Sequence, residues 1–174
     1  MALSILKELL EGYLQSLFDE GVVNDQFSQV QTLKSVNGPD FVVQLVDTYF
    51  AEMETLLAEL SSHSDLPALD FSKLAVLAGK VKDLSSCMGA EHVRLSCANL
   101  IQACDQKNKQ NFSQALIWMK NEFSQTRIKL EAYAQLEVVG HRTFRFNPAE
   151  PPCFSTCPKE SKFQQRLYRM IVVI

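Results

Sequence analysis

The sequence lacks any hydrophobic run that approaches the roughly 20 apolar residues needed to span a bilayer. Only six glycines and six prolines occur in 174 residues, which excludes a collagen-like chain and argues against wholesale disorder. The apolar N-terminal stretch contains acidic residues and no small-residue cleavage site, so we expect no secretory signal. Five cysteines, an odd number without a framework spacing, are typical of reduced thiols. We therefore expect a protein of the cytoplasm and nucleus with no membrane partner.

Motifs of independent catalysis are also missing. The chain has no glycine-rich phosphate loop, no Ser-x-x-Lys, no His-Glu-x-x-His and no paired catalytic carboxylates. Cys153 and Cys157 are close in sequence and His141 is not far away, but a zinc site needs further ligands at suitable spacing and none follows. We therefore expect no enzyme, no metal site and no cofactor.

Charge divides the chain into two parts. Residues 1–139 contain 11 basic and 18 acidic side chains, a net charge of −7, whereas residues 140–174 contain six basic and two acidic ones, a net charge of +4. Nucleic-acid binding depends on neutralising phosphates, so the acidic part argues against a nucleic-acid partner. We predict a helical domain over 1–139 and a basic, proline-containing and flexible C-terminal tail over 140–174.

Apolar residues recur at helical spacing through the acidic part. The stripes predict six helices, at about 6–18, 25–33, 41–60, 70–88, 93–104 and 113–136. Expected caps are Asn24 or Asp25 for the second helix and Asn111 or Ser113 for the sixth, with Pro39 in the first turn of the third. Long amphipathic helices on short connections pack as a bundle. We therefore predict an all-α fold: an antiparallel four-helix bundle of the last four helices, with two additional N-terminal helices against it.

The helix over 70–88 has an unexplained glycine on its outer face. At about 100° per residue, the side that faces the core holds Leu74, Leu77, Val81, Leu84 and Met88. The opposite side holds Ala75, Gly79, Lys82, Asp83 and Ser86. A glycine at an exposed helical position costs roughly 0.5–1 kcal/mol relative to alanine. Nothing in the local pattern compensates for Gly79, so a functional or historical reason is needed.

The segment Gly-Lys-Val-Lys-Asp-Leu-Ser-Ser-Cys-Met-Gly-Ala over 79–90 resembles a family signature. Plant histidine-containing phosphotransfer (HPt) proteins have His-Gln-Leu-Lys-Gly-Ser-Ser-Ser-Ser-Ile/Val-Gly-Ala there, and the matching positions are Lys82, Ser85, Ser86, Gly89 and Ala90. The resemblance extends over segments 16–27 and 39–50 and covers about 135 residues. It implies an HPt-like helical domain whose family carries phosphoryl groups to and from receiver domains.

The phosphoacceptor histidine of that family falls on Gly79, which has no nucleophile. The chain therefore resembles the pseudo-HPt proteins. The resemblance implies a monomer that docks on receiver domains of hybrid histidine kinases and response regulators, and that negatively regulates a His-to-Asp phosphorelay in cytokinin signalling. The docking residues it implies are Gly79, Lys80, Lys82, Asp83 and Ser86, with Gln29 and Leu33 from the second helix.

A second departure is Asp83, where the family has glycine. Receiver active sites are acidic and bind Mg²⁺, so we expect weaker and more Mg²⁺-dependent docking. Two other functions stay open: a binding module for a partner other than a receiver, or an active carrier that uses His63, His92 or His141. The tail is either a basic arm that steers the protein toward acidic receivers or a gene-model artefact such as a mispredicted 3′ exon.

Overall fold

The computed structural model describes residues 2–145. The helices in this range are α1 (Ala2–Asp19), α2 (Asp25–Thr32), α3 (Lys34–Asn37), α4 (Phe41–Ser64), α5 (Phe71–Met88), α6 (Glu91–Asp105) and α7 (Lys109–Arg145). Between residues 2 and 145 the only β-type pairing is an isolated bridge between Val23 and Ala90. No helix in this range is long and apolar enough to cross a membrane. Most of the predicted tail lies outside the described residues.

Helices α4 to α7 form the predicted antiparallel four-helix bundle. Helix α5 packs against α4 and α6, α6 packs against α7, and α4 closes the ring on α7. The side chains at its centre are fully buried: Met53, Leu74, Val81, Leu100 and Met119. Burial of side chains of this size contributes about 1.5–3 kcal/mol each. The predicted fold class is confirmed.

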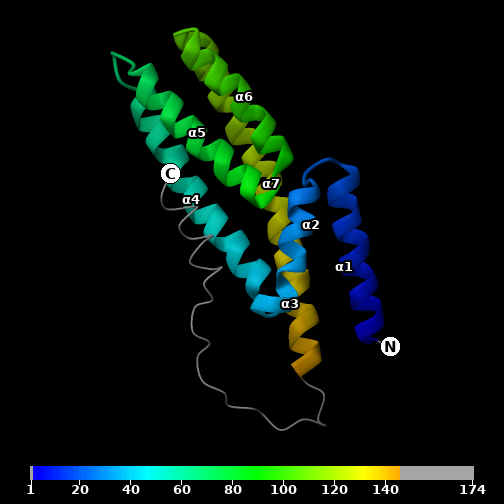
Figure 1. The fold of residues 1–174 in the computed structure, drawn as a ribbon. Helices are drawn as coiled ribbons and strands as arrows, with labels where there is room; N and C mark the ends of the chain where they lie inside the picture. The colour runs from blue at the N-terminus through cyan, green and yellow to red at the C-terminus, as the bar shows by residue number, and fades with distance from the viewer. Residues whose placement is uncertain (1, 146–174) are drawn as a thin grey trace, which may run out of the picture.

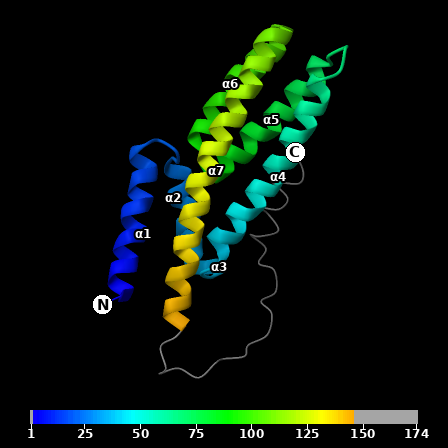
Figure 2. The ribbon, with the colours of Figure 1, turned by 180° about the vertical axis from the view of Figure 1, so that it is seen from behind.

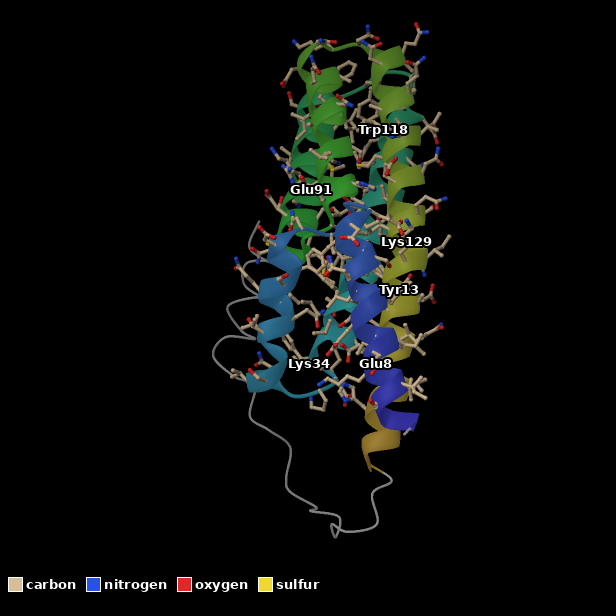
Figure 3. All side chains as sticks on the ribbon, turned by 90° about the vertical axis from the view of Figure 1, so that its right-hand side faces the viewer. Glu8, Tyr13, Lys34, Glu91, Trp118 and Lys129 are labelled. Atoms are coloured by element: carbon tan, nitrogen blue, oxygen red, sulfur yellow. The ribbon has the colours of Figure 1, made fainter. Side chains whose placement is uncertain are left out.

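The N-terminal helices cover one end of the bundle. Helix α1 packs along the C-terminal half of α7, as seen from behind in Figure 2. The Tyr13 hydroxyl donates a hydrogen bond to the carbonyl of Lys129 at 3.0 Å, and these two residues meet in Figure 3. Helices α2 and α3 lead from the end of α1 to the start of α4 (Figure 1). The two predicted N-terminal helices are therefore present, followed by one further short helix.

A close backbone contact joins the N-terminal segment to the turn between α5 and α6. Gly89 ends α5 with φ 78°, and a Cβ atom there would lie 2.5 Å from the backbone nitrogen of Phe27. The Asn24 nitrogen donates to the Gly89 carbonyl at 3.0 Å, and the Glu91 nitrogen donates to the Val22 carbonyl at 3.0 Å. Gly89 therefore supplies both a left-handed conformation and the space that α2 occupies.

A buried carboxylate holds α3 against α7. Glu137 is 2% exposed and forms an ion pair with Lys34 of α3. The Tyr133 hydroxyl donates to the same carboxylate, and His141 Nε2 lies 3.1 Å from it. A buried charge is tolerated when it is paired and hydrogen-bonded. This network fixes α3, and with it the start of α4, on the last part of α7.

Several predicted helix boundaries are wrong. Helix α7 continues to Arg145 instead of ending near residue 136. An interior glycine costs only about 1 kcal/mol, and the contacts of Glu137 favour continuation past Gly140. Helix α7 also begins earlier, because the Asn108 side chain accepts a hydrogen bond from the Asn111 nitrogen at 3.0 Å. Asn24 is confirmed as the α2 cap, whereas Pro39 precedes the α4 cap at Asp40.

Two predicted core residues are exposed. Ile128 of α7 is 62% exposed and Leu9 of α1 is 57% exposed. Both lie in helices predicted from apolar spacing, at about 113–136 and 6–18. Helix α1 packs mainly on α7 and so has only one covered side, which leaves Leu9 exposed. Leu33 lies between α2 and α3 rather than inside one continuous second helix.

Replacing Gly89 with alanine is expected to destabilise the fold. The left-handed conformation costs a side-chain-bearing residue roughly 1–2 kcal/mol, and the Cβ overlap with Phe27 adds to this cost. Urea unfolding of Gly89→Ala should show a lower free energy of unfolding. The matched control is Gly12→Ala on the exposed side of α1, where a Cβ meets nothing within 4 Å; it should stabilise by about 0.5–1 kcal/mol. Equal stability of the two variants would contradict the role assigned to Gly89.

Candidate functional site

Helix α5 has well-defined ends, which set the orientation of its outer face. Asp70 caps its start by accepting hydrogen bonds from the nitrogens of Ser72 at 3.1 Å and Lys73 at 3.2 Å. Gly89 ends it. The predicted inner face is buried at Leu74, Leu77, Val81 and Met88, and Leu84 is half-buried. The opposite face of α5 is therefore available to a partner.

Ser85 matches the family signature but belongs to the core. It is fully buried, and its hydroxyl lies 3.0 Å from the hydroxyl of Tyr49 on α4. Burial raises the pKa of Tyr49, and the hydrogen bond to Ser85 lowers it by a smaller amount. Both hydroxyls thereby gain the partner that buried polar groups need. Ser85 fixes α5 against α4 and does not face a partner protein.

Gly79 lies on the outer face of α5, as predicted. A Cβ atom at this position would meet nothing within 4 Å. Its φ is not positive; the glycines with positive φ are Gly21, Gly38 and Gly89. Neither close packing nor backbone geometry therefore requires glycine here. A larger side chain at residue 79 would project outward from the helix.

Charged side chains surround Gly79. Asp83 is exposed, whereas Lys80 and Lys82 are half-buried. None of the three forms a salt bridge within residues 2–145, so the Lys80–Asp83 pair that their spacing allows is not formed. The Ser86 hydroxyl donates to the carbonyl of Lys82 at 2.7 Å, one turn back along the helix. The outer face thus holds one lysine, one carboxylate and one engaged hydroxyl, and Lys80 lies to the side of this face.

Two apolar features beside this face were not predicted. Val76 is 61% exposed and lies three residues before Gly79, on the same side of the helix. Between α4 and α5 there is also a depression of about 20 Å³, lined by Leu45, Thr48, Tyr49, Glu52, Leu84, Cys87 and Met88. The sequence signal available for Val76 was that it is apolar but lies outside the apolar stripe of α5, which predicts an exposed apolar side chain. The depression depends on how the two helices pack, which the sequence does not state.

Gln29 and Leu33 are not adjacent to Gly79. Helix α2 meets α5 at Gly89 and then runs away from it toward α3 (Figure 1). Gly89 follows Gly79 by ten positions, about 15 Å along the helix axis. Gln29 is exposed and Leu33 is half-buried. The predicted docking residues therefore form one group on α5 and a separate pair at and just beyond α2.

The three histidines of the chain lie on other helices. His63 is in the last turn of α4. His92 is on α6, with its Nδ1 3.6 Å from a carboxylate oxygen of Glu122. His141 is on α7 beside Glu137. None shares the outer face of α5.

The described cysteines are core residues or edge residues of the bundle. Cys97 and Cys104 are buried and Cys87 is half-buried. Burial raises the pKa of Cys97 to about 12, although the charge of Lys82 acts in the opposite direction; it raises the pKa of Cys104 to about 11. Such thiols are protonated at neutral pH and unreactive. Cys153 and Cys157 lie outside the described residues, within which no group of three or more potential ligands could hold a metal ion.

Comparison with known proteins identifies the family to which this helical arrangement belongs. No family model matches the chain. Histidine-containing phosphotransfer protein 1 of Arabidopsis thaliana is 34% identical over 128 residues, covering 74% of this chain and 83% of the relative. Pseudo histidine-containing phosphotransfer protein 2 of Oryza sativa subsp. japonica is 30% identical over 131 residues, covering 75% and 87%.

Solved structures agree with the sequence relatives. A histidine-containing phosphotransfer protein from maize superposes with a TM-score of 0.73 at 33% identity, over 77% of this chain and 98% of that one. A rice protein described in the same terms has a TM-score of 0.77 at 28% identity, over 81% and 99%. The family resemblance seen in the segment around Gly79 thus extends over the whole described fold. The chain belongs to the histidine-containing phosphotransfer proteins.

Proposed function

We propose that this chain is a catalytically inactive, pseudo-HPt member of its family, which docks on receiver domains and negatively regulates a His-to-Asp two-component phosphorelay in cytokinin signalling. The observation that carries the proposal is a glycine at residue 79, where the family resemblance places the phosphoacceptor histidine. Phosphoryl transfer through a carrier needs an imidazole nucleophile, and glycine has none. A carrier that docks without accepting phosphoryl groups competes with active carriers for the same receivers.

The rest of the outer face supports retained docking. Lys82 is one turn from Gly79 and forms no salt bridge with any described residue, so its charge is available to an acidic receiver pocket. Val76 adds exposed apolar area on the same side. We assign the centre of the docking surface to Gly79, Lys80, Lys82, Asp83 and Ser86.

Gln29 and Leu33 belong to the edge of this surface rather than its centre. A standard interface covers about 800 Å² on each partner, which is wide enough to extend from the middle of α5 past Gly89 to α2. Receivers of hybrid kinases and response regulators are the partners that this proposal implies. The protein acts as a monomer in the cytoplasm and nucleus, where these receivers are reached.

A partner other than a receiver is the second candidate function, and Asp83 is the observation that favours it. This exposed carboxylate lies one turn from Gly79 and repels an acidic pocket that holds no metal ion. An active carrier that uses another histidine has less support. His92 and His141 both lie beside carboxylates, and neither they nor His63 belong to α5.

Calorimetric titration with isolated receiver domains, in the presence and absence of Mg²⁺, tests the proposal directly. Micromolar binding, about −8 kcal/mol, is the expected result. In a reconstituted relay, the chain should then slow phosphoryl transfer to an active carrier without becoming labelled itself. Absence of binding to every receiver tested would refute the docking function. Acid-labile labelling of the wild-type chain would refute the claim that it is inactive.

Replacing Gly79 with histidine is expected to create a phosphoryl acceptor. The Cβ of residue 79 has open space, so the variant should fold, and Lys82 is already in position to support the phosphoryl group electrostatically. Incubation with a phosphorylated receiver should yield an acid-labile label on Gly79→His. Gly79→Gln is the matched control, since it has similar size but no imidazole, and it should stay unlabelled. A folded Gly79→His that binds receivers but accepts no label would contradict this geometry.

Replacing Asp83 with glycine, the family residue, is expected to strengthen receiver binding in the absence of Mg²⁺. Interactions between exposed charges contribute about 0.2–1 kcal/mol, which corresponds to a rise in affinity of up to roughly fivefold. The gain should be smaller when Mg²⁺ is present, because the metal ion offsets the carboxylate. Asp83→Asn removes the charge but keeps the size of the side chain, and it should reproduce most of the gain in receiver affinity. Titrations that show the same affinity for all three proteins, with and without Mg²⁺, would rule out this role for Asp83.

A further inference from the structure

A groove of about 610 Å³ lies between the first half of α4 and the C-terminal half of α7, two neighbouring helices seen from behind in Figure 2. Its lining is largely apolar: Phe50 and Ala134 are buried and Val138 is half-buried. The lining residues fall within 43–54 on α4 and 127–139 on α7, which corresponds to about 17 and 18 Å along the two helix axes. The described lining comes from α4 and α7 alone, so the groove is separate from the candidate docking surface on α5.

The groove has excess negative charge. Asp47 of α4 and Glu131 of α7 are exposed on its two walls, and neither forms a salt bridge with any residue that the structure describes. Glu54 forms an ion pair with Arg127 across the groove, and the Arg127 guanidinium lies 5.3 Å from the centre of the Phe50 ring. The groove therefore offers apolar area beside two carboxylates without an ion pair, which is complementary to a segment that is both apolar and basic.

The sequence contains one such segment after the described residues. Residues 159–174 include four basic and one acidic side chain. Their apolar residues recur at the spacing of one helix face, and these are Phe163, Leu167, Met170 and Ile174. The basic residues recur at a similar spacing, and these are Lys159, Lys162, Arg166 and Arg169. At about 100° per residue, the two sets fall on adjacent sides of a helix. The segment thus has the pattern of a basic amphipathic helix.

The chain is long enough for this segment to reach the groove. Helix α7 ends at Arg145, and Lys159 follows it by 14 positions, which span at most about 46–50 Å. The far end of the groove, at Arg127, lies 18 positions back along α7, about 27 Å from Arg145. The chain can therefore turn back after α7 and place the segment along the groove.

We infer that segment 159–174 packs into the groove between α4 and α7 of its own chain, with its apolar residues on the apolar lining and its basic residues beside Asp47 and Glu131. A helix from Phe163 to Ile174 is about 17 Å long, which matches the length of the groove. Contact between the grooves of two copies is disfavoured, because their carboxylates repel each other. The inference does not depend on receiver docking, since the groove and the α5 surface have no described residue in common.

Zero-length carbodiimide cross-linking of the full chain tests the contact, because it joins only a lysine and a carboxylate that touch. We expect Lys159 and Lys162 to be joined to the two groove carboxylates that lack an ion pair. Glu59 is the control, since it is also exposed on α4 but lies outside the groove. Cross-links to Glu59 that are as frequent as those to the groove would overturn the inference. In a mixture of light and isotopically heavy chains, products that join a light chain to a heavy one would overturn it in favour of a second copy.

Filling the groove gives an independent test. Ala51 is exposed and lines the groove, so Ala51→Trp places an indole in it. Ala58→Trp is the matched control, because Ala58 is also exposed on α4 but does not line the groove. We expect backbone amides of 159–174 to exchange hydrogen about tenfold more slowly in the wild type and in Ala58→Trp than in Ala51→Trp, as when about nine-tenths of the chains hold the segment. Equal exchange rates in the three folded proteins would show that the segment does not occupy the groove.

Removing the groove charges tests the electrostatic part without adding bulk. Asp47→Asn combined with Glu131→Gln should speed exchange over 159–174 by up to roughly fivefold for each ion pair lost. Glu59→Gln should leave the exchange rate unchanged. Added salt should speed exchange in the wild type, because it screens the same ion pairs. Exchange that responds neither to the double substitution nor to salt would overturn the charge complementarity from which the inference is drawn.

Discussion

The junction between the N-terminal segment and the four-helix bundle depends on one backbone approach, that of Phe27 to Gly89. A side chain at residue 89 would overlap the Phe27 nitrogen, and the hydrogen bonds of Asn24 and Glu91 across this contact require the same closeness. The contact also ends α5 at a defined residue. The buried stripe of α5 sets which side of the helix faces outward, and Gly89 fixes where that helix stops and where α2 approaches it.

The parts of the fold that depend on local pattern were predictable from sequence. The apolar stripe of α5 predicts which side is buried, and Asp70 and Gly89 predict its ends. The length of α7 was not predictable, since it depends on Lys34 of α3 pairing with Glu137, a contact between residues far apart in the chain. The separation of Gln29 and Leu33 from the middle of α5 was not predictable for a similar reason. Sequence spacing predicts which residues share a helix face, but it does not predict the direction in which one helix runs relative to another.

The candidate site joins a buried scaffold to an outward-facing glycine. Ser85 and Tyr49 hold α5 against α4 through buried hydroxyls, so the helix that presents residue 79 is fixed by its own core. The residues that face outward can then change without disturbing that support. This separation explains how a member of the family keeps the fold, and five of the twelve positions of the signature, with glycine at residue 79. It also explains why Asp83, rather than any packing defect, is the feature expected to alter docking.

The open surroundings of Gly79 have an evolutionary consequence. Because a Cβ atom at residue 79 would meet nothing within 4 Å beyond its own helix backbone, the packing of the bundle does not require glycine there. Selection for a folded chain therefore does not constrain the residue at position 79, and only selection on signalling acts on it. After gene duplication, one copy could lose its imidazole without any compensating substitution elsewhere. Chains with and without an imidazole at this position can in this way share one scaffold.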